Sequence, residues 1–228
     1  MMTIIDHIEE FRRRVIFILI FIFALSFIAF FASDHLIRFV DSNMPENVEL
    51  IVTTPLEIVL ARIGLSIFVS ILVSIPFIIY QIAKFVKPAF SEKEKKYMWA
   101  IPLSLFLFVF GFSSAFLFIV KFGMNFLASN AASLGIRTLW SLNDTIFFIF
   151  SLSFIFGLCF QLPLVVLILN KIGLASHTSL KRYRKYVYVF IFILGAVVTP
   201  TVDPFTQIVI SVPLIVLYEI SLLLVKIF

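Results

Sequence analysis

The side chains that could do chemistry in this chain are few, and most of them are acids that stand beside long apolar stretches. The first group runs from Asp6 to Arg14, immediately before an apolar run. In a helix, the spacing i,i+4 brings Glu10 beside Arg14 and Glu9 beside Arg13. Two interpretations stay open: an amphipathic cap held at the lipid headgroups, or a carboxylate that receives a basic ligand.

Two further acids stand in loops, where each also has a simple structural interpretation. Glu94 follows Ser91 in the spacing of a capping box, so it is expected to cap a helix and still present an oxygen to a ligand. The segment 141–144 has a similar spacing, with Asp in place of Glu. Asp203 precedes Pro204, which predicts a helix N-cap followed by a proline in the first turn.

Two polar side chains, Gln161 and Glu219, fall inside apolar runs. A polar or charged group in lipid is costly, so such residues usually face protein or water. Gln161 stands two residues before Pro163, where it is placed to satisfy backbone groups that the proline frees. Glu219 is the strongest candidate for a functional group inside the membrane.

The sequence contains none of the common catalytic motifs. It has no glycine-rich phosphate loop, no H-E-x-x-H and no G-x-S-x-G. Its three histidines lack metal-ligand spacing, and the single cysteine, Cys159, cannot form an internal disulfide. We therefore expect no enzymatic activity, no cofactor and no bound metal.

The elements that position these residues are predicted to be membrane-spanning helices. Hydrophobic types make up 62% of the 228 residues and charged types only 14%, which is too apolar for a soluble domain. A helix needs about 20 apolar residues to cross a bilayer. We predict an all-α integral membrane protein with six transmembrane helices in a single polytopic domain, residues 1–228. The predicted spans are about 15–32, 58–83, 97–120, 145–169, 186–198 and 205–225.

The fifth and sixth predicted spans are short. A helix over 186–198 covers only about 20 Å at 1.5 Å per residue. A span this short forces the bilayer to thin or the helix to pack against its neighbours. We therefore expect a thinned bilayer beside this last pair of helices.

The distribution of positive charge predicts the orientation. Most of the 18 Lys and Arg residues lie before the first span, in the loops after the second and fourth spans, and at the C-terminus. Cytoplasmic loops carry such an excess, so both termini are expected on the cytoplasmic side. Topology thereby accounts for the net charge of +5 without a nucleic-acid partner.

Taken in order, the motifs of this chain resemble those of the TatC family, the multi-spanning subunit of the twin-arginine protein translocase. The resemblance covers nearly the whole chain. It rests on H-x-x-E-x-R at residues 7–12, F-V-K-P-A-F at 85–90 followed by Glu94, F-G-L-C-F-Q-L-P at 156–163, T-P at 199–200, D-P-F-T-Q at 203–207, and Y-E-I at 218–220.

The resemblance implies a receptor that binds signal peptides carrying two consecutive arginines and helps to export folded proteins with the proton gradient. Glu10 and Glu94 would meet the two arginines, while Arg12, Phe85 and Pro88 would shape the same cytoplasmic surface. The helices would form a concave, TatC-like arrangement in a prokaryotic cytoplasmic membrane, or in an organelle descended from one. Implied partners are single-span proteins similar to TatA or TatB, and further copies of the chain.

The chain departs from the family pattern at one intramembrane position. The family often has glutamate where this chain has Gln161, and glutamine cannot ionise, although it can hydrogen-bond a partner helix. Two other classes also fit six spans. A small proton- or ion-coupled secondary transporter would show inverted repeats, but the first three spans do not resemble the last three. A purely structural membrane scaffold is the other alternative.

Overall fold

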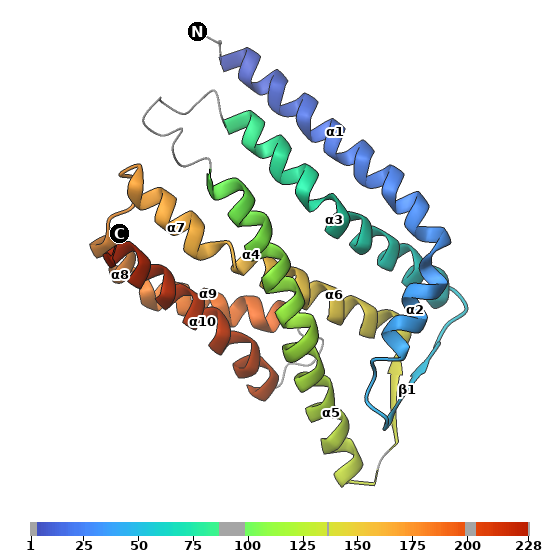
Figure 1. The fold of residues 1–228 in the computed structure, drawn as a ribbon. Helices are drawn as coiled ribbons and strands as arrows, with labels where there is room; N and C mark the ends of the chain where they lie inside the picture. The colour runs from blue at the N-terminus through green and yellow to red at the C-terminus, as the bar shows by residue number, and fades with distance from the viewer. Residues whose placement is uncertain (1–3, 87–98, 136, 199–203, 228) are drawn as a thin grey trace.

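The computed structural model describes residues 4–86, 99–135, 137–198 and 204–227, and Figure 1 shows their arrangement. Most of the described residues are helical, and two short strands are also present. In chain order the elements are α1 (Ile4–Phe31), α2 (Ser33–Asp41), β1 (Val48–Ile51), α3 (Glu57–Val86), α4 (Ala100–Ser114), the π-helix η3 (Ala115–Val120), α5 (Lys121–Ser133), β2 (Thr138–Ser141), α6 (Leu142–Cys159), α7 (Leu162–Lys171), α8 (His177–Arg182), α9 (Arg184–Val198) and α10 (Pro204–Ile227).

Five helical stretches among the described residues are long and apolar enough to cross a bilayer. They are His7–Phe31, Glu57–Phe85, Ala100–Ser133, Leu142–Lys171 and Gln207–Ile227. Helix α9 occupies the predicted fifth span but has only 15 residues, so it is short as expected. The expectation of a short sixth span is wrong, because α10 has 24 residues, or about 36 Å of helix.

The third stretch extends well beyond the predicted span. Helix α4 passes through η3 into α5 without a break, so the segment from Lys121 to Ser133, which we expected to be a polar connection, is helical. This segment contains three alanines, a leucine and a methionine, which favour helix, and it continues directly from η3. Its low hydropathy marks the end of the apolar span but not the end of the helix.

The fourth stretch is interrupted. Helix α6 ends at Cys159 and α7 begins at Leu162, with Pro163 in its first turn. Proline has no N–H to donate and is best tolerated in the first turn of a helix, which is where the break places Pro163, whereas Pro76 and Pro213 lie inside the continuous helices α3 and α10.

The segments at the end of the molecule opposite the termini form a small sheet that we did not predict. Strands β1 and β2 pair in parallel, with Val48 opposite Thr138 and Ile51 opposite Ser141. Each strand has only four residues, and the two are separated by four helical elements in sequence. The sheet joins the segment after α2 to the segment before α6 (Figure 1).

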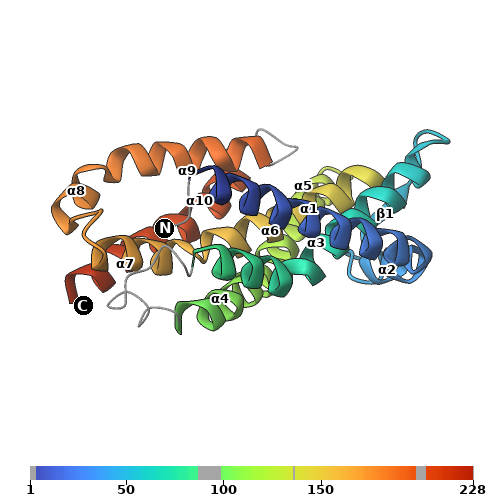
Figure 2. The same ribbon diagram turned by 90° about the horizontal axis from the view of Figure 1, so that it is seen from above.

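The core lies around α6, and α1 lies outside it. Helix α6 contributes ten buried residues, whereas no residue in the apolar window of α1 is buried. Helix α1 packs along α3 (Figure 1), and Figure 2 shows α9 at one edge of the molecule. Large apolar side chains of α1 such as Phe23 and Phe31, 76% and 72% exposed, are suited to lipid.

Two glycine–phenylalanine contacts hold α4 against α6. A Cβ atom added to Gly157 would come within 2.8 Å of the ring of Phe108, and one added to Gly111 within 2.7 Å of Phe160. Each helix therefore offers a glycine to a phenylalanine of the other. Small residues let membrane helices approach closely, which explains the glycine in the motif at 156–163.

Candidate functional site

Glu10 lies where the start of α1 meets the end of α3. One carboxylate oxygen, Oε1, accepts hydrogen bonds from Nε of Arg14, at 3.1 Å, and from Nη2 of the same side chain. Arg14 also donates from Nη1 to Oε1 of Gln81 on α3, at 3.0 Å. The other carboxylate oxygen, Oε2, is buried without a hydrogen-bond partner among the described residues. The predicted pair of Glu10 with Arg14 is therefore present and links the two helices through Gln81, whereas no ion pair between Glu9 and Arg13 forms among the described residues.

Phe85 fastens the first turns of α1 to the last turn of α3. Its ring stacks on His7, with centroids 4.8 Å apart, and lies 5.7 Å from the ring of Phe11. Aromatic pairs at these distances stabilise a contact beyond the area they bury. The structure therefore places Phe85 and Glu10, which are far apart in sequence, at the same end of the same helix pair.

A cavity of about 280 Å³ opens beside this ion pair, lined by Glu10, Arg13, Arg14, Phe17, Gln81 and Lys84. Among the described residues of that lining, Glu10 is the one acid, and Arg13, Arg14 and Lys84 are cations. Arg13 also lies over the ring of Phe17, 5.6 Å from its centroid, which holds its charge toward α1. The cavity thus presents one carboxylate in a basic setting.

The other residues predicted to bind the signal peptide either lie away from this cavity or fall outside the described residues. Arg12 is exposed and does not line the cavity. Pro88 and Glu94 fall outside the described residues, as does Asp203 of the last turn. The structure therefore brings Glu10 and Phe85 together.

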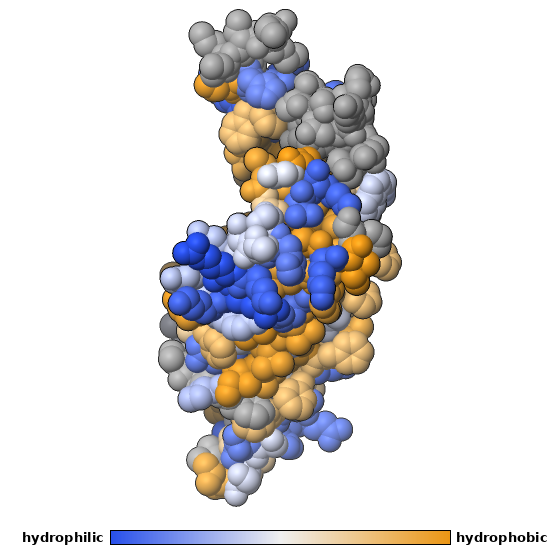
Figure 3. Space-filling model, turned by 90° about the vertical axis from the view of Figure 1, so that its left-hand side faces the viewer, coloured by the Kyte–Doolittle hydropathy of each residue, from blue (hydrophilic) through white to orange (hydrophobic). Residues whose placement is uncertain are grey.

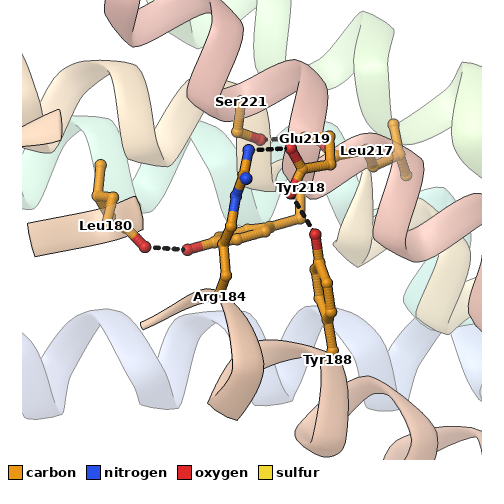
Figure 4. A network of polar contacts seen from close by, with 7 residues as sticks. All are labelled: Leu180, Arg184, Tyr188, Leu217, Tyr218, Glu219 and Ser221. Carbon is orange, nitrogen blue, oxygen red and sulfur yellow. Dashed lines mark hydrogen bonds and ion pairs between the residues drawn. The ribbon is translucent and has the colours of Figure 1, made fainter. Parts of the chain in front are cut away.

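Glu219 lies in a network that joins three helices (Figure 4). Arg184 donates from Nη2 to Oε2 of Glu219, and the hydroxyl of Tyr188 donates to Oε1. Next to it, the hydroxyl of Tyr218 donates to the carbonyl oxygen of Leu180 in α8, at 2.8 Å. Both oxygens of this carboxylate are therefore occupied by residues of α9.

Sequence reasoning missed the partners of Glu219. We assigned Arg184 only to the positive charge that orients the chain. Arg184 and Tyr188 have i,i+4 spacing on α9, so they share a face of that helix. That spacing was a usable signal for two donors that point the same way, although nothing in the sequence indicates that the face meets Glu219.

Gln161 connects two helices and does not satisfy the backbone beside Pro163. Its side-chain Nε2 donates to the carbonyl oxygen of Ser104 in α4, at 2.7 Å. The side chain stands in the break between α6 and α7, from which it can reach α4. The expectation of a backbone contact near the proline is replaced by a contact between helices.

Sequence reasoning also missed Glu57, which is buried with 5% of its surface exposed. Its Oε2 accepts from the backbone N–H and the hydroxyl of Thr53, at 2.5 and 2.6 Å, and its Oε1 accepts from the hydroxyl of Ser141, at 2.7 Å. The signal was present, because Thr54 and Glu57 have the spacing of a capping box. Ser141 also caps α6, as predicted, by accepting from the N–H of Asp144.

Among the described residues, no group of three His, Cys, Asp or Glu side chains is arranged to hold a metal ion. Cys159 is a free thiol.

Comparison with known proteins gives consistent results. A family model described as Sec-independent protein translocase protein (TatC) matches residues 6–213. The Sec-independent protein translocase protein TatC of Aquifex aeolicus is 32% identical over 99% of this chain and 95% of its own length. The protein of the same name from Halalkalibacterium halodurans is 31% identical over 97% of this chain and 88% of its own length. The crystal structure of a twin arginine translocase receptor, TatC, matches with a TM-score of 0.88 and 30% identity, covering 97% of this chain and 98% of that one.

Proposed function

Because this chain belongs to the TatC family and is a core subunit of a twin-arginine, Sec-independent protein translocase, we propose that its cytoplasmic surface is the receptor for the signal peptide. One arginine of the signal binds at Glu10 and the other at Glu94, and Arg12, Phe85 and Pro88 complete the surface. The bound folded protein is then exported with the proton gradient.

The observation that carries this proposal is the position of Glu10, the one acid among the described residues that line a cavity with Arg13, Arg14, Lys84, Phe17 and Gln81. Its Oε1 is held by Arg14, and its Oε2 has no partner among the described residues. A guanidinium group presents several N–H donors in a plane and fits a carboxylate better than lysine does. The surrounding cations repel loosely basic peptides, so a well-placed acid sharpens selectivity.

The proposed topology has six spans, with α9 as the short fifth, and both termini in the cytoplasm of a prokaryotic cell. The starts of α1 and the ends of α3, α7 and α10 lie toward the same side of the molecule (Figure 1). On that side, hydrophilic side chains gather at the height of α8, which carries Lys181 and Arg182 (Figure 3). Positive charge at one end of a helical bundle favours the cytoplasmic face.

A thinned bilayer beside α9 follows from the same topology. Fifteen residues of helix rise about 22 Å, well below the roughly 30 Å of a bilayer core. In Figure 1 the adjoining ends of α9 and α10 stop short of the level that α5 reaches. Cryo-EM density of the protein in a lipid nanodisc is expected to show a local dip there, and a uniform thickness would contradict this part of the proposal.

Single-span partners similar to TatA or TatB are proposed to pack against the last three spans. Helix α9 offers them exposed apolar side chains such as Phe190 and Val197, 62% and 79% exposed. Gln161 and Glu219 are predicted to contact these partners within the membrane. Glu219 would have to make such a contact while Arg184 and Tyr188 bind it.

The proposal is tested by crosslinking a twin-arginine signal peptide to the protein in membranes. The double variant Glu10→Ala/Glu94→Ala is expected to lose the crosslink, and each single variant to weaken it. Glu9→Ala is the matched control, because Glu9 is the neighbouring acid on α1 but is exposed and does not line the cavity. An unchanged crosslink in the double variant would overturn the site assignment.

A further inference from the structure

A large cavity lies at the end of the molecule away from the termini, and the receptor proposal does not use it. It has a volume of about 720 Å³ and lies between the turn that follows α2 and one face of α5. The turn contributes Glu46 and Asn47, and α5 contributes Lys121, Phe122 and Asn125. Its volume is in the range of sites that hold small molecules or a lipid headgroup.

The two walls carry opposite charges that do not neutralise each other. Lys121 stands on the α5 wall and Glu46 on the opposite wall, and both are exposed. Neither forms an ion pair within the part of the chain that the structure describes. The outer pair Arg137 and Glu49 behaves differently, because these two side chains do contact each other, at 3.4 Å. A cavity with separated, unpaired charges suits a ligand that itself carries both charges.

Uncharged polar groups stand beside each charge. Asn125 follows Lys121 by one helical turn on α5, and Asn47 follows Glu46 in the turn. Neither asparagine side chain has a hydrogen-bond partner among the described residues. An anionic oxygen near Lys121 and Asn125 and an ammonium group near Glu46 and Asn47 would each find a charge and an amide.

The approach to the cavity is apolar and leads along the membrane-spanning part of the helix. Phe122 lines the cavity and is 56% exposed, and Phe118, one turn earlier, is 71% exposed. Lys121 itself follows directly on the last residue of the predicted third span, which places it at the membrane surface. The preceding residues form the π-helix η3, and π-helical turns occur frequently at functional sites.

We propose that this cavity binds the headgroup of a zwitterionic phospholipid with a primary amine, of the phosphatidylethanolamine type, from the leaflet at this end of the protein. The phosphodiester lies at Lys121 and Asn125, and the ammonium lies at Glu46. The acyl chains descend past Phe122 onto Phe118. Hydrogen-bonding oxygens on the amine side favour a primary ammonium over choline, which has no N–H to donate. The site is independent of what binds at Glu10.

The test is a lipid titration of the full-length protein in detergent, read by native mass spectrometry. Phosphatidylethanolamine, phosphatidylcholine and phosphatidylglycerol with identical acyl chains serve as probes. The wild type is expected to retain phosphatidylethanolamine best. Lys121→Gln should weaken its retention by about tenfold, as expected for one lost charge-assisted hydrogen bond. Glu46→Gln should remove the preference over phosphatidylglycerol, because only the amine needs this acid.

Matched controls come from the neighbouring exposed pair. Arg137→Gln and Glu49→Gln remove the same charges at the same end of the protein but outside the cavity, and should leave retention unchanged. Equal retention by the wild type and by Lys121→Gln/Glu46→Gln would overturn the proposal, as would an equal loss in the controls. Water-soluble glycerophosphoethanolamine distinguishes the source of the headgroup. It should not displace the lipid at equal concentration, and binding as tight as that of the lipid would overturn the assignment to a membrane ligand.

Discussion

Two arginine–carboxylate pairs stand on the side of the molecule where the termini lie, and they are built differently. Arg14 and Glu10 belong to one turn of α1, whereas Arg184 and Glu219 join α9 to α10. In the first pair one carboxylate oxygen has no partner among the described residues. In the second pair both oxygens are bound, one by Arg184 and the other by Tyr188.

Under the receptor proposal, the difference separates an acid that binds a ligand, Glu10, from an acid that holds two helices together, Glu219. Glu10 lines a cavity, and its buried Oε2 has no hydrogen-bond partner among the described residues; the receptor proposal assigns this acid to an arginine of the signal. Each carboxylate oxygen of Glu219 accepts a hydrogen bond from α9, the shortest predicted span, and these contacts hold α9 against α10. An acid inside a membrane protein is often taken as functional because it is costly there. Here two donors offset this cost, so holding α9 against α10 is one role of Glu219, and its contact with partner proteins stays a prediction.

The largest expected effect is a loss of stability in Glu219→Ala. This change leaves the guanidinium of Arg184 and the hydroxyl of Tyr188 without their acceptor. Breaking a buried ion pair costs about 3–5 kcal/mol. The side chains of Glu219 and Arg184 are 32% and 39% exposed, so solvent screens their contact. We therefore expect a smaller loss of stability, about 2 kcal/mol.

The measurement is thermal unfolding of the purified protein in detergent, with Glu10→Ala as the comparison. The pair at Glu10 is an i,i+4 pair on one helix, for which about 0.5 kcal/mol is typical. The double variant Arg184→Leu/Glu219→Leu should recover most of the lost stability, because no charge is left unpaired. A double variant no more stable than Glu219→Ala would show that the contact between the two charges is not what stabilises α9.

A smaller effect is expected for Tyr188→Phe, which removes one hydrogen bond to Glu219 and keeps the ring. The loss should be about 1 kcal/mol in the same unfolding experiment. Tyr186→Phe on the same helix is the control, since Tyr186 is 61% exposed and should change little. Crosslinking of the signal peptide should be the same in both variants. A crosslink lost only in Tyr188→Phe would bring Glu219 into the receptor site and end the distinction between the two pairs.

Much of the fold could be predicted because helix in lipid follows from apolar length. Long runs located five spans, and the short run at 186–198 located α9. The helical segment from Lys121 to Ser133 was missed because hydropathy reports where lipid ends, whereas a helix that has already formed continues at little further cost into water. The pairing of β1 with β2 was missed because two four-residue strands far apart in sequence carry too little pattern to predict a partner.

The candidate site divides in the same way. The contact of Glu10 with Arg14 follows from spacing along one helix, so the sequence predicts it. The contacts of Arg184 with Glu219 and of Gln161 with Ser104 depend on which faces of distant helices meet. That information lies in packing, such as the close approach of α4 and α6 that Gly157 allows. Spacing along one helix predicts contacts within that helix, whereas contacts between helices depend on tertiary packing.

The smallest expected effect is the response of the two pairs to salt. Raising the salt concentration from about 0.1 M to 1 M shortens the screening length from about 10 Å to 3 Å. A signal peptide must approach the cavity at Glu10 through water and past three cations, so its affinity should change several-fold between the two salt concentrations. The stability difference between the wild type and Glu219→Ala should hardly change, because Arg184 and Glu219 are in direct contact and only about one-third exposed. Fluorescence anisotropy of a labelled signal peptide and thermal unfolding give the two curves. If the curves respond equally to salt, the two pairs are equally accessible to water, and Glu219 must be considered a binding group alongside Glu10.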